Sequence, residues 1–197
     1  MRIVRISGFL ALLALLSCDT FNSGPPCTAI QGQYIRVLGL DISNQQMSPC
    51  CDEPIPPFSK IHFKEYRMQL NFQIQYYSEL KTNSMLWNSC YAYDCPQNGE
   101  NGSKETISEF DIVSLYDFDE NHKKGESVRD LFDYEENKTR ISLNTYMKSN
   151  SRHIRRATNY LYLMQEPTQS DTVAFKITLS LDNGNKFTEI TSPVIFN

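Results

Sequence analysis

The segment from Tyr66 to Tyr77 limits the possible folds more than any other part of the sequence. Apolar and aromatic residues alternate there with polar ones, at Tyr66, Met68, Leu70, Phe72, Ile74 and Tyr76. Because successive side chains of a β-strand point to opposite faces, this pattern predicts a strand with one buried and one solvated face. The solvated face is rich in glutamine, whose amides either contact water or hydrogen-bond an extended ligand.

Other segments have the β-branched and aromatic composition of strands. Leu38, Leu40 and Ile42 are expected to share one face of a first strand over residues 33–42, and further strands are predicted over 106–118 and 158–164. Residues 173–181 and 186–196 predict a hairpin around the turn at 182–185. Pro193 cannot donate a ladder hydrogen bond, so the closing strand is expected to lie at an edge or to bulge there.

Helical periodicity is scarce in this chain. Ser127 and Ser142 are the expected N-caps of two short helices, because a serine hydroxyl can accept an early backbone N–H. Proline-rich and glycine-rich stretches separate the strands and predict long loops. We therefore expect an all-β fold, an antiparallel β-sandwich of immunoglobulin-like or transthyretin-like type with one or two short helices.

The N-terminus has the features of a secretory signal peptide. Arg2 and Arg5 give it a positive start, and the 11 residues from Ile6 to Leu16 form a short hydrophobic run. A membrane-spanning helix needs about 20 apolar residues. The run is too short to remain as an anchor, and Ser17–Cys18 supplies the small-residue cleavage step.

The residues Leu15 to Cys18 form a lipobox, the pattern that separates a lipoprotein signal from an ordinary one. The thiol of Cys18 is expected to carry a diacylglyceryl group, and cleavage before Cys18 exposes its amine for a further acyl chain such as palmitate. Two or more chains hold a protein firmly on a membrane. We expect a signal peptide at 1–17, a lipidated cysteine and flexible tether at 18–31, and one β-sandwich domain at 32–197.

Charge and length agree with one exported domain. Removing Arg2 and Arg5 with the signal peptide lowers the basic count from 19 to 17 against 23 acidic residues, so the mature chain carries a net charge of −6. Such acidity argues against nucleic acid as a partner. The 180 residues from Cys18 onward can bury one substantial core.

Five cysteines remain once Cys18 is assigned to lipid. In the oxidising conditions outside the cytoplasm they predict two disulfides and one leftover thiol, which allows 15 arrangements. The adjacent pair Cys50–Cys51 most simply bonds in two directions. A zinc site is disfavoured, because adjacent cysteines are too close for both to bind one metal. The candidates are Cys27, Cys50, Cys51, Cys90 and Cys95.

Three stretches carry a resemblance to a known family. These are Asn88–Ala92, Gly102–Glu105 and residues 111–132. The chain resembles a family of cell-envelope lipoproteins of similar length from Bacteroides-type gut bacteria, a domain of unknown function. The resemblance implies an envelope lipoprotein, in such bacteria one of the outer membrane, facing either the periplasm or the cell surface. It implies no catalytic residues.

No enzyme motif is present in the sequence. His62, His122 and His153 lie outside H-E-x-x-H, no G-x-S-x-G occurs, and no nucleotide-binding loop is found, so no catalytic residue and no cofactor are predicted. Residues 117–121 begin like a calcium loop, but His122 and Val128 occupy the positions that need Gly and Glu. We therefore predict no metal, and a solvated acidic turn there.

Several surface features are candidates for binding. Trp87, Tyr91 and Tyr93 could stack on a sugar or form a local core. The basic residues near Arg152 form either a solvated loop or a contact to lipid head groups or an anionic glycan; they are Lys148, Arg152, His153, Arg155 and Arg156. Thr172 lies in an Asp-Thr-Val sequence that resembles an O-glycosylation acceptor.

Two classes of function follow from these observations. The first is a membrane-anchored, non-catalytic module that binds a glycan or an envelope protein through loops at one end of the sandwich, or that acts as a structural spacer. The second is a hydrolase or metal-dependent enzyme built from residues remote in sequence. The anchor and the missing motifs favour the first.

Lipidation of Cys18 is testable in a bacterial host that exports the chain. We expect the wild-type chain to be cleaved before Cys18 and to enter the detergent phase of a Triton X-114 separation, because acyl chains replace the signal peptide as the apolar segment. Cys18→Ala should stay uncleaved and should lack the acyl mass in intact-mass spectrometry. A processed wild-type chain without acyl mass would contradict the lipobox assignment.

Overall fold

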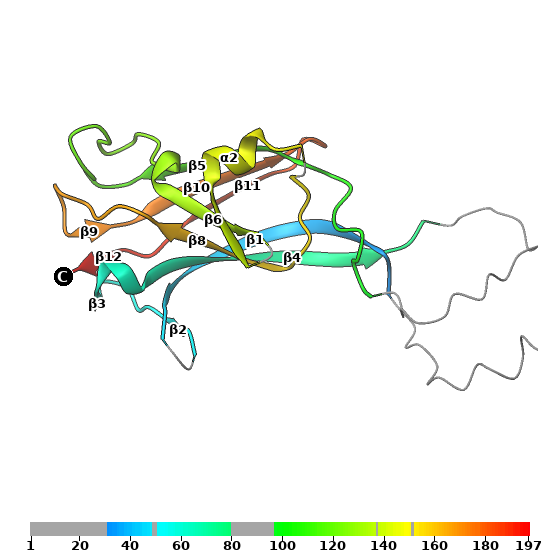
Figure 1. Ribbon diagram of the computed structural model, residues 1–197, viewed down its shortest axis with the longest axis horizontal. Coiled ribbons are helices and arrows are strands. Elements are labelled where there is room, and N and C mark those ends of the chain that lie inside the picture. Colours follow the sequence, from blue (N-terminus) through cyan, green and yellow to red (C-terminus); the bar gives the residue numbers. More distant parts are fainter. Residues whose placement is uncertain (1–30, 49–50, 80–96, 137, 151) are drawn as a thin grey trace, which may run out of the picture. The chain divides into compact units, whose positions relative to one another are not determined.

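The computed structural model describes residues 31–48, 51–79, 97–136, 138–150 and 152–197. Gln31–Ser78 and Asn98–Asn197 form one compact unit. The fold is an all-β antiparallel sandwich with long loops and short helices (Figure 1), as the sequence predicts.

A six-stranded sheet forms one layer of the sandwich. All its neighbouring strands are antiparallel, and β4 has the bounds and the buried face that its alternating residues predict. The strand order is β2 (Glu53–Pro54), β1 (Tyr34–Gln46), β4 (Tyr66–Tyr77), β8 (Thr158–Leu163), β6 (Phe132–Glu136) and β7 (Thr139–Ser142).

Two three-stranded sheets complete the fold. They are β11 (Lys186–Ile190), β10 (Phe175–Leu181) and β5 (Ile107–Ser114), and β3 (Lys60–Ile61), β12 (Val194–Phe196) and β9 (Thr172–Val173). The predicted hairpin is confirmed as β10 and β11. Around Pro193 the chain leaves that sheet, and β12 pairs with β9 and β3 instead.

Aromatic rings from different sheets meet in the core. The rings of Phe132 on β6 and Phe175 on β10 are edge to face, with centroids 5.2 Å apart. Phe110 on β5 meets Tyr134 on β6 in the same way at 6.5 Å. Such pairs add about 0.5–1.5 kcal/mol to the burial of their area, so they help to hold the two layers together.

Strand β1 departs from the sequence prediction in its phase. A bulge between Val37 and Gly39 adds one residue, so Ile35 and Val37 face the core before it and Leu40 faces the core after it. Leu38 is consequently 58% exposed, although it was expected to share a face with Leu40. Strict alternation cannot reveal a bulge, which re-aims every later side chain.

The two predicted helices have different outcomes. Helix α2 (Leu143–Lys148) begins as expected, because the Ser142 hydroxyl accepts the Thr145 N–H at 3.2 Å. The other helix is a single 3₁₀ turn, η2 (Arg129–Leu131), and its N-cap is Val128 without a side-chain bond. Ser127 lies one residue before this N-cap: its hydroxyl accepts the Arg129 N–H at 3.5 Å, as predicted, and also hydrogen-bonds the Asp111 carboxylate across the loop.

The Phe132–Phe175 contact makes a direct test of the sandwich. We expect Phe175→Ala to lower the free energy of unfolding by about 3–5 kcal/mol, because it empties a fully buried site between the layers. Lys176→Ala, one residue along β10 with its side chain in solvent, should change it by less than about 0.5 kcal/mol. Urea unfolding followed by circular dichroism measures both; similar losses would contradict the assigned strand faces.

Candidate functional site

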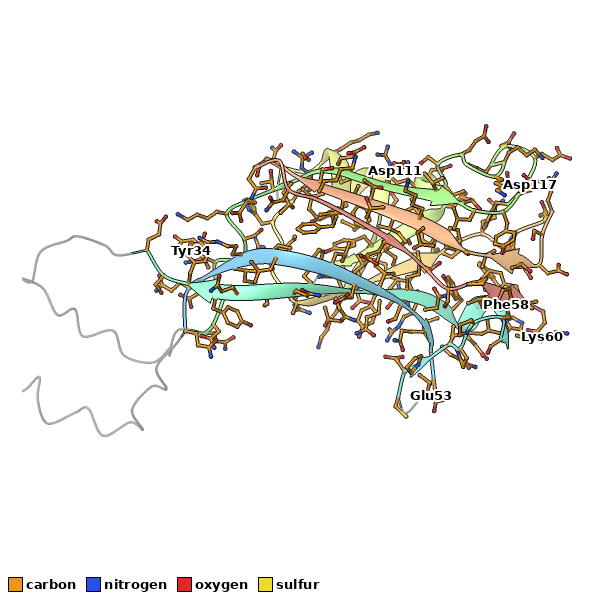
Figure 2. All side chains as sticks on the ribbon, turned by 180° about the vertical axis from the view of Figure 1, so that it is seen from behind. Tyr34, Glu53, Phe58, Lys60, Asp111 and Asp117 are labelled. Carbon is orange, nitrogen blue, oxygen red and sulfur yellow. The ribbon has the colours of Figure 1, made fainter. Side chains whose placement is uncertain are left out.

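Three loops gather at the end of the sandwich opposite to Tyr34, the first residue of β1 (Figure 2). The loops span residues 55–65, 115–127 and 164–172. The first and third are joined through β12, which pairs with both β3 and β9. The second and third are joined because the Phe118 carbonyl accepts the Thr168 and Gln169 N–H groups. We call this region the loop end.

Phe58 is the most unusual residue of the loop end. Its side chain is 61% exposed, and its backbone has φ +59°, in the left-handed region. Its N–H donates to the Pro193 carbonyl at 2.7 Å, and Ser59 N–H closes a turn onto Pro56 at 3.2 Å. These bonds hold the backbone of Phe58 in a conformation that costs roughly 1–2 kcal/mol, since a bulky residue rarely adopts it.

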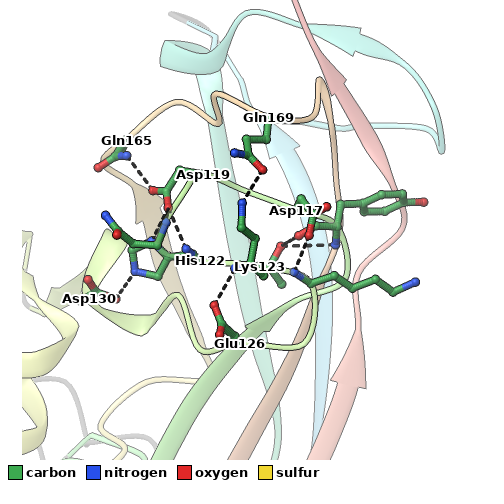
Figure 3. A network of polar contacts seen from close by, with 12 residues as sticks. Asp117, Asp119, His122, Lys123, Glu126, Asp130, Gln165 and Gln169 are labelled. Atoms are coloured by element: carbon green, nitrogen blue, oxygen red, sulfur yellow. Dashed lines mark hydrogen bonds and ion pairs between the residues drawn. The ribbon is translucent and has the colours of Figure 1, made fainter.

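The second loop is built around a buried carboxylate, Asp119 (Figure 3). Asp119 is only 7% exposed. One of its oxygens accepts the backbone N–H groups of Asn121 and His122 at 2.8 Å and contacts the His122 ring at 2.9 Å. Its other oxygen accepts the Gln165 amide at 3.0 Å, which ties the second loop to the third. The predicted solvated acidic turn is therefore an ordered loop.

His122 lies between two carboxylates. Its Nδ1 contacts Asp119, and its Nε2 lies 3.4 Å from Asp130. Burial alone would lower the pKa of His122, but the hydrogen bond and charge of Asp119, followed by those of Asp130, outweigh it and raise the pKa. For Asp119, burial would raise the pKa, and the bonds from His122 and the backbone outweigh it and lower the pKa.

The remaining polar groups of this loop bond within the loop end. Asp117 accepts the Lys124 N–H at 2.9 Å, Glu126 accepts the Lys123 N–H at 2.7 Å, and the Lys123 ammonium donates to Gln169 at 2.7 Å. Within the described ranges, no group of three or more His, Cys, Asp or Glu residues is arranged to hold a metal ion. Because carboxylates engage both ring nitrogens of His122, the ring is not directed at a nucleophile.

The outer face of the six-stranded sheet is a second candidate. Its amides bond to neighbours, Gln69 to Asn71 at 2.8 Å and Gln73 to Asp41 at 2.9 Å. Two guanidinium groups cover tyrosine rings, Arg67 over Tyr160 at 3.8 Å and Arg140 over Tyr162 at 3.5 Å. Since these side chains satisfy one another, the face favours the solvated interpretation over an extended ligand.

Of the predicted site residues, Thr172 and His62 lie in the loop end, and His153 and Cys51 lie outside it. Thr172 is half-buried in β9, opposite Ile195 of β12. His62 accepts the Lys64 N–H at the start of η1 (Phe63–Glu65), whereas His153 contacts the Ser103 carbonyl. Cys51 is exposed. The predictions on Cys18, Cys27, Cys50, Cys90, Cys95, Trp87, Tyr91 and Tyr93 lie outside the described residues.

Sequence reasoning missed Phe58 altogether. A left-handed position is usually signalled by Gly or Asn, and Phe gives no such signal. The preceding Pro56–Pro57 pair predicts a turn but not its geometry. The structure alone identifies Phe58 as an exposed ring on a strained backbone.

Comparisons with known proteins assign no family. No protein-family model matches the chain, and no curated protein matches it. A similar solved structure is the C-terminal domain of the Streptococcus pyogenes antigen I/II-family protein AspA, with 10% identity and a TM-score of 0.26. The match covers 79% of this chain and 46% of that one, so the chain spans less than half of that structure. A TM-score of this size is too low to assign a function.

None of the helices in the described segments is long and apolar enough to cross a bilayer.

The clamp of His122 between Asp119 and Asp130 predicts a defined pH dependence. A raised histidine pKa stabilises the fold fully below about pH 6.5, and this stabilisation is lost as pH rises through the folded-state pKa. The lowered pKa of Asp119 stabilises the fold above about pH 3.9, and this stabilisation is lost as pH falls through the folded-state pKa. We therefore expect the stability difference between the wild type and His122→Gln to be largest between these limits, measured by urea unfolding.

A proton NMR titration of the His122 ring provides the control. Asp130→Asn should lower the pKa of His122, because it removes the second carboxylate. A His122 pKa below about 6.5 in the wild type would contradict the clamp.

Proposed function

We propose that the chain is a lipid-anchored, non-catalytic binding module of the bacterial cell envelope, placed in the outer membrane and presenting its loop end to a glycan or an envelope protein. The lipobox at Leu15–Cys18 supports the anchor. The position of the loop end, opposite to Tyr34 at the start of β1, supports its role as the presented surface. We also propose that the chain belongs to the Bacteroides-type lipoprotein family that its sequence resembles.

The observation that carries the proposal is the strained, exposed ring of Phe58. Total stability of a domain is about 5–15 kcal/mol, so a backbone cost of roughly 1–2 kcal/mol is a substantial share of it. An exposed ring contributes little to folding in return. Strain that does not serve the fold is typical of binding surfaces, where an aromatic side chain can fill a partner's pocket or stack on a sugar.

The loop end suits recognition for a second reason. Proline residues precede Phe58, and the backbone bonds to Pro56 and Pro193 fix its loop. Because these contacts order the loop before any partner arrives, little conformational entropy is lost on binding. The clamp around His122 orders the neighbouring loop in the same way.

The catalytic alternative receives less support from the same residues. A general base needs one ring nitrogen directed at a nucleophile or a water-filled site. Both nitrogens of His122 contact carboxylates. His62, in the first loop of the same end, and His153, outside it, each contact a backbone group. The loop end therefore fits binding better than hydrolysis.

Phe58→Asn tests the proposal because stability and binding should move in opposite directions. Asn tolerates the left-handed region, so we expect the free energy of unfolding to rise by about 0.5–1 kcal/mol. Binding to the glycan or envelope protein that the wild-type chain selects should weaken at least about tenfold, as for a truncated hot spot. Urea unfolding gives the first quantity, and glycan arrays with envelope-fraction pull-downs give the second.

Lys138→Asn is the matched control. Lys138 also has a left-handed backbone, with φ +67°, but it lies in the turn between β6 and β7. We expect a similar gain in stability with unchanged binding. Equal binding by the Phe58 variant and the wild type, or no wild-type binding on either platform, would refute the assigned role of the loop end.

A further inference from the structure

The end of the sandwich where the chain enters is assembled from three distant segments, 31–36, 98–104 and 152–156. Ile35 N–H donates to the Gly102 carbonyl at 2.9 Å, and Ser103 N–H donates to the Ile154 carbonyl at 2.8 Å. Gly102 has φ +70°, and a Cβ there would lie 3.2 Å from the Ile154 oxygen, so this junction needs glycine. The contacts bring the basic cluster of 152–156 beside the first residues of β1.

Positive side chains are exposed on this assembled end. They are Arg36, Lys104, Arg155 and Arg156. Glu100 lies in segment 98–104 and Glu105 directly follows it, and the four cations outnumber these two carboxylates. We call this region the cationic end. Its charge is opposite to that of the whole chain, which is −4.

A pair of tyrosines accompanies the cations. The rings of Tyr34 on β1 and Tyr77 on β4 lie 5.6 Å apart. The Lys104 ammonium lies 4.6 Å from the Tyr34 ring centre, and the Arg36 guanidinium lies 5.0 Å from that of Tyr77. Both rings are half-buried, so they present an apolar body and a polar tip together with positive charge.

This combination matches the chemistry of a lipid head-group layer. Tyrosine is enriched at the membrane–water interface because its ring is amphipathic. Lys and Arg near an anionic surface each contribute to binding through the phosphate groups. An anionic polysaccharide could meet the same cations and stack on the same rings, so the position of this end in the chain is what favours the membrane.

The position of the cationic end in the chain agrees with a membrane contact. Gln31 is the first described residue, its N–H donates to Asn98 at 2.7 Å, and it lies three positions before Tyr34. The predicted tether from Cys18 therefore enters the domain here. We propose that the cationic end docks on the phosphate-bearing head groups of the membrane that holds the anchor. This proposal rests on the lipid anchor of the proposed function, and it orients the loop end away from the membrane.

Vesicle binding tests the docking surface without the acyl chains. The mature chain, residues 18–197 with Cys18→Ser, is mixed with vesicles of phosphatidylcholine alone or with about 30% phosphatidylglycerol, and binding is measured by co-sedimentation. We expect binding to the anionic vesicles despite the negative charge of the chain, and release at about 0.5 M NaCl. Arg155→Glu with Arg156→Glu should weaken it at least about tenfold.

The matched control reverses the charge of two lysines at the loop end. Lys60→Glu with Lys64→Glu changes the net charge equally and should leave vesicle binding unaltered. Equal losses in both double variants would show a net-charge effect and overturn the proposal, as would equal binding to neutral vesicles. Dextran sulfate that binds with the same residue dependence, when anionic vesicles do not bind, would assign the surface to an anionic polysaccharide instead. Since acylation plays no part here, a missing anchor is detected separately by the Cys18→Ala experiment.

Discussion

Packing of the six-stranded sheet against strands β11, β10 and β5 is the constraint on which the rest of the molecule depends. The inner face of β4 is almost inaccessible to water, and so is that of β10. Each sheet has an apolar face that must be covered, and each covers the other. Because interiors pack as densely as organic crystals, the aromatic pairs between β5, β6 and β10 fix the separation of the layers.

This packing also determines where the chain can leave the sheets. Pro193 interrupts the closing strand, and the chain then crosses to β12, between β3 and β9. That crossing places the Pro193 carbonyl where it accepts the Phe58 N–H. The strained backbone of Phe58 is thus maintained by the same crossing that completes the fold, and the exposed ring is a consequence of tertiary structure.

The two ends of the sandwich differ in how their charged side chains are arranged. At the loop end a buried carboxylate and a histidine neutralise each other, and the three loops together hold seven carboxylates and four lysines. At the cationic end, arginine and lysine lie over tyrosine rings and extend into solvent. Under the proposed function, the cationic end faces the membrane and the loop end faces the partner.

The sequence by itself determined the features that depend on neighbouring residues. Alternation defined β4, the turn residues defined the β10–β11 hairpin, and Ser142 defined the start of α2. Together these features were sufficient for the all-β sandwich, because period and turn chemistry are local. The bulge at Leu38 and the buried state of Asp119 were missed.

Tertiary structure decided the arrangement of both candidate surfaces. The basic segment 152–156 meets Ser103 across about 50 residues of sequence, and Phe58 meets Pro193 across more than 130. Such contacts depend on which strands pair and on the depth at which a side chain is buried. A period-two pattern specifies the face of a strand but not its partner, so these contacts could not be predicted from the sequence.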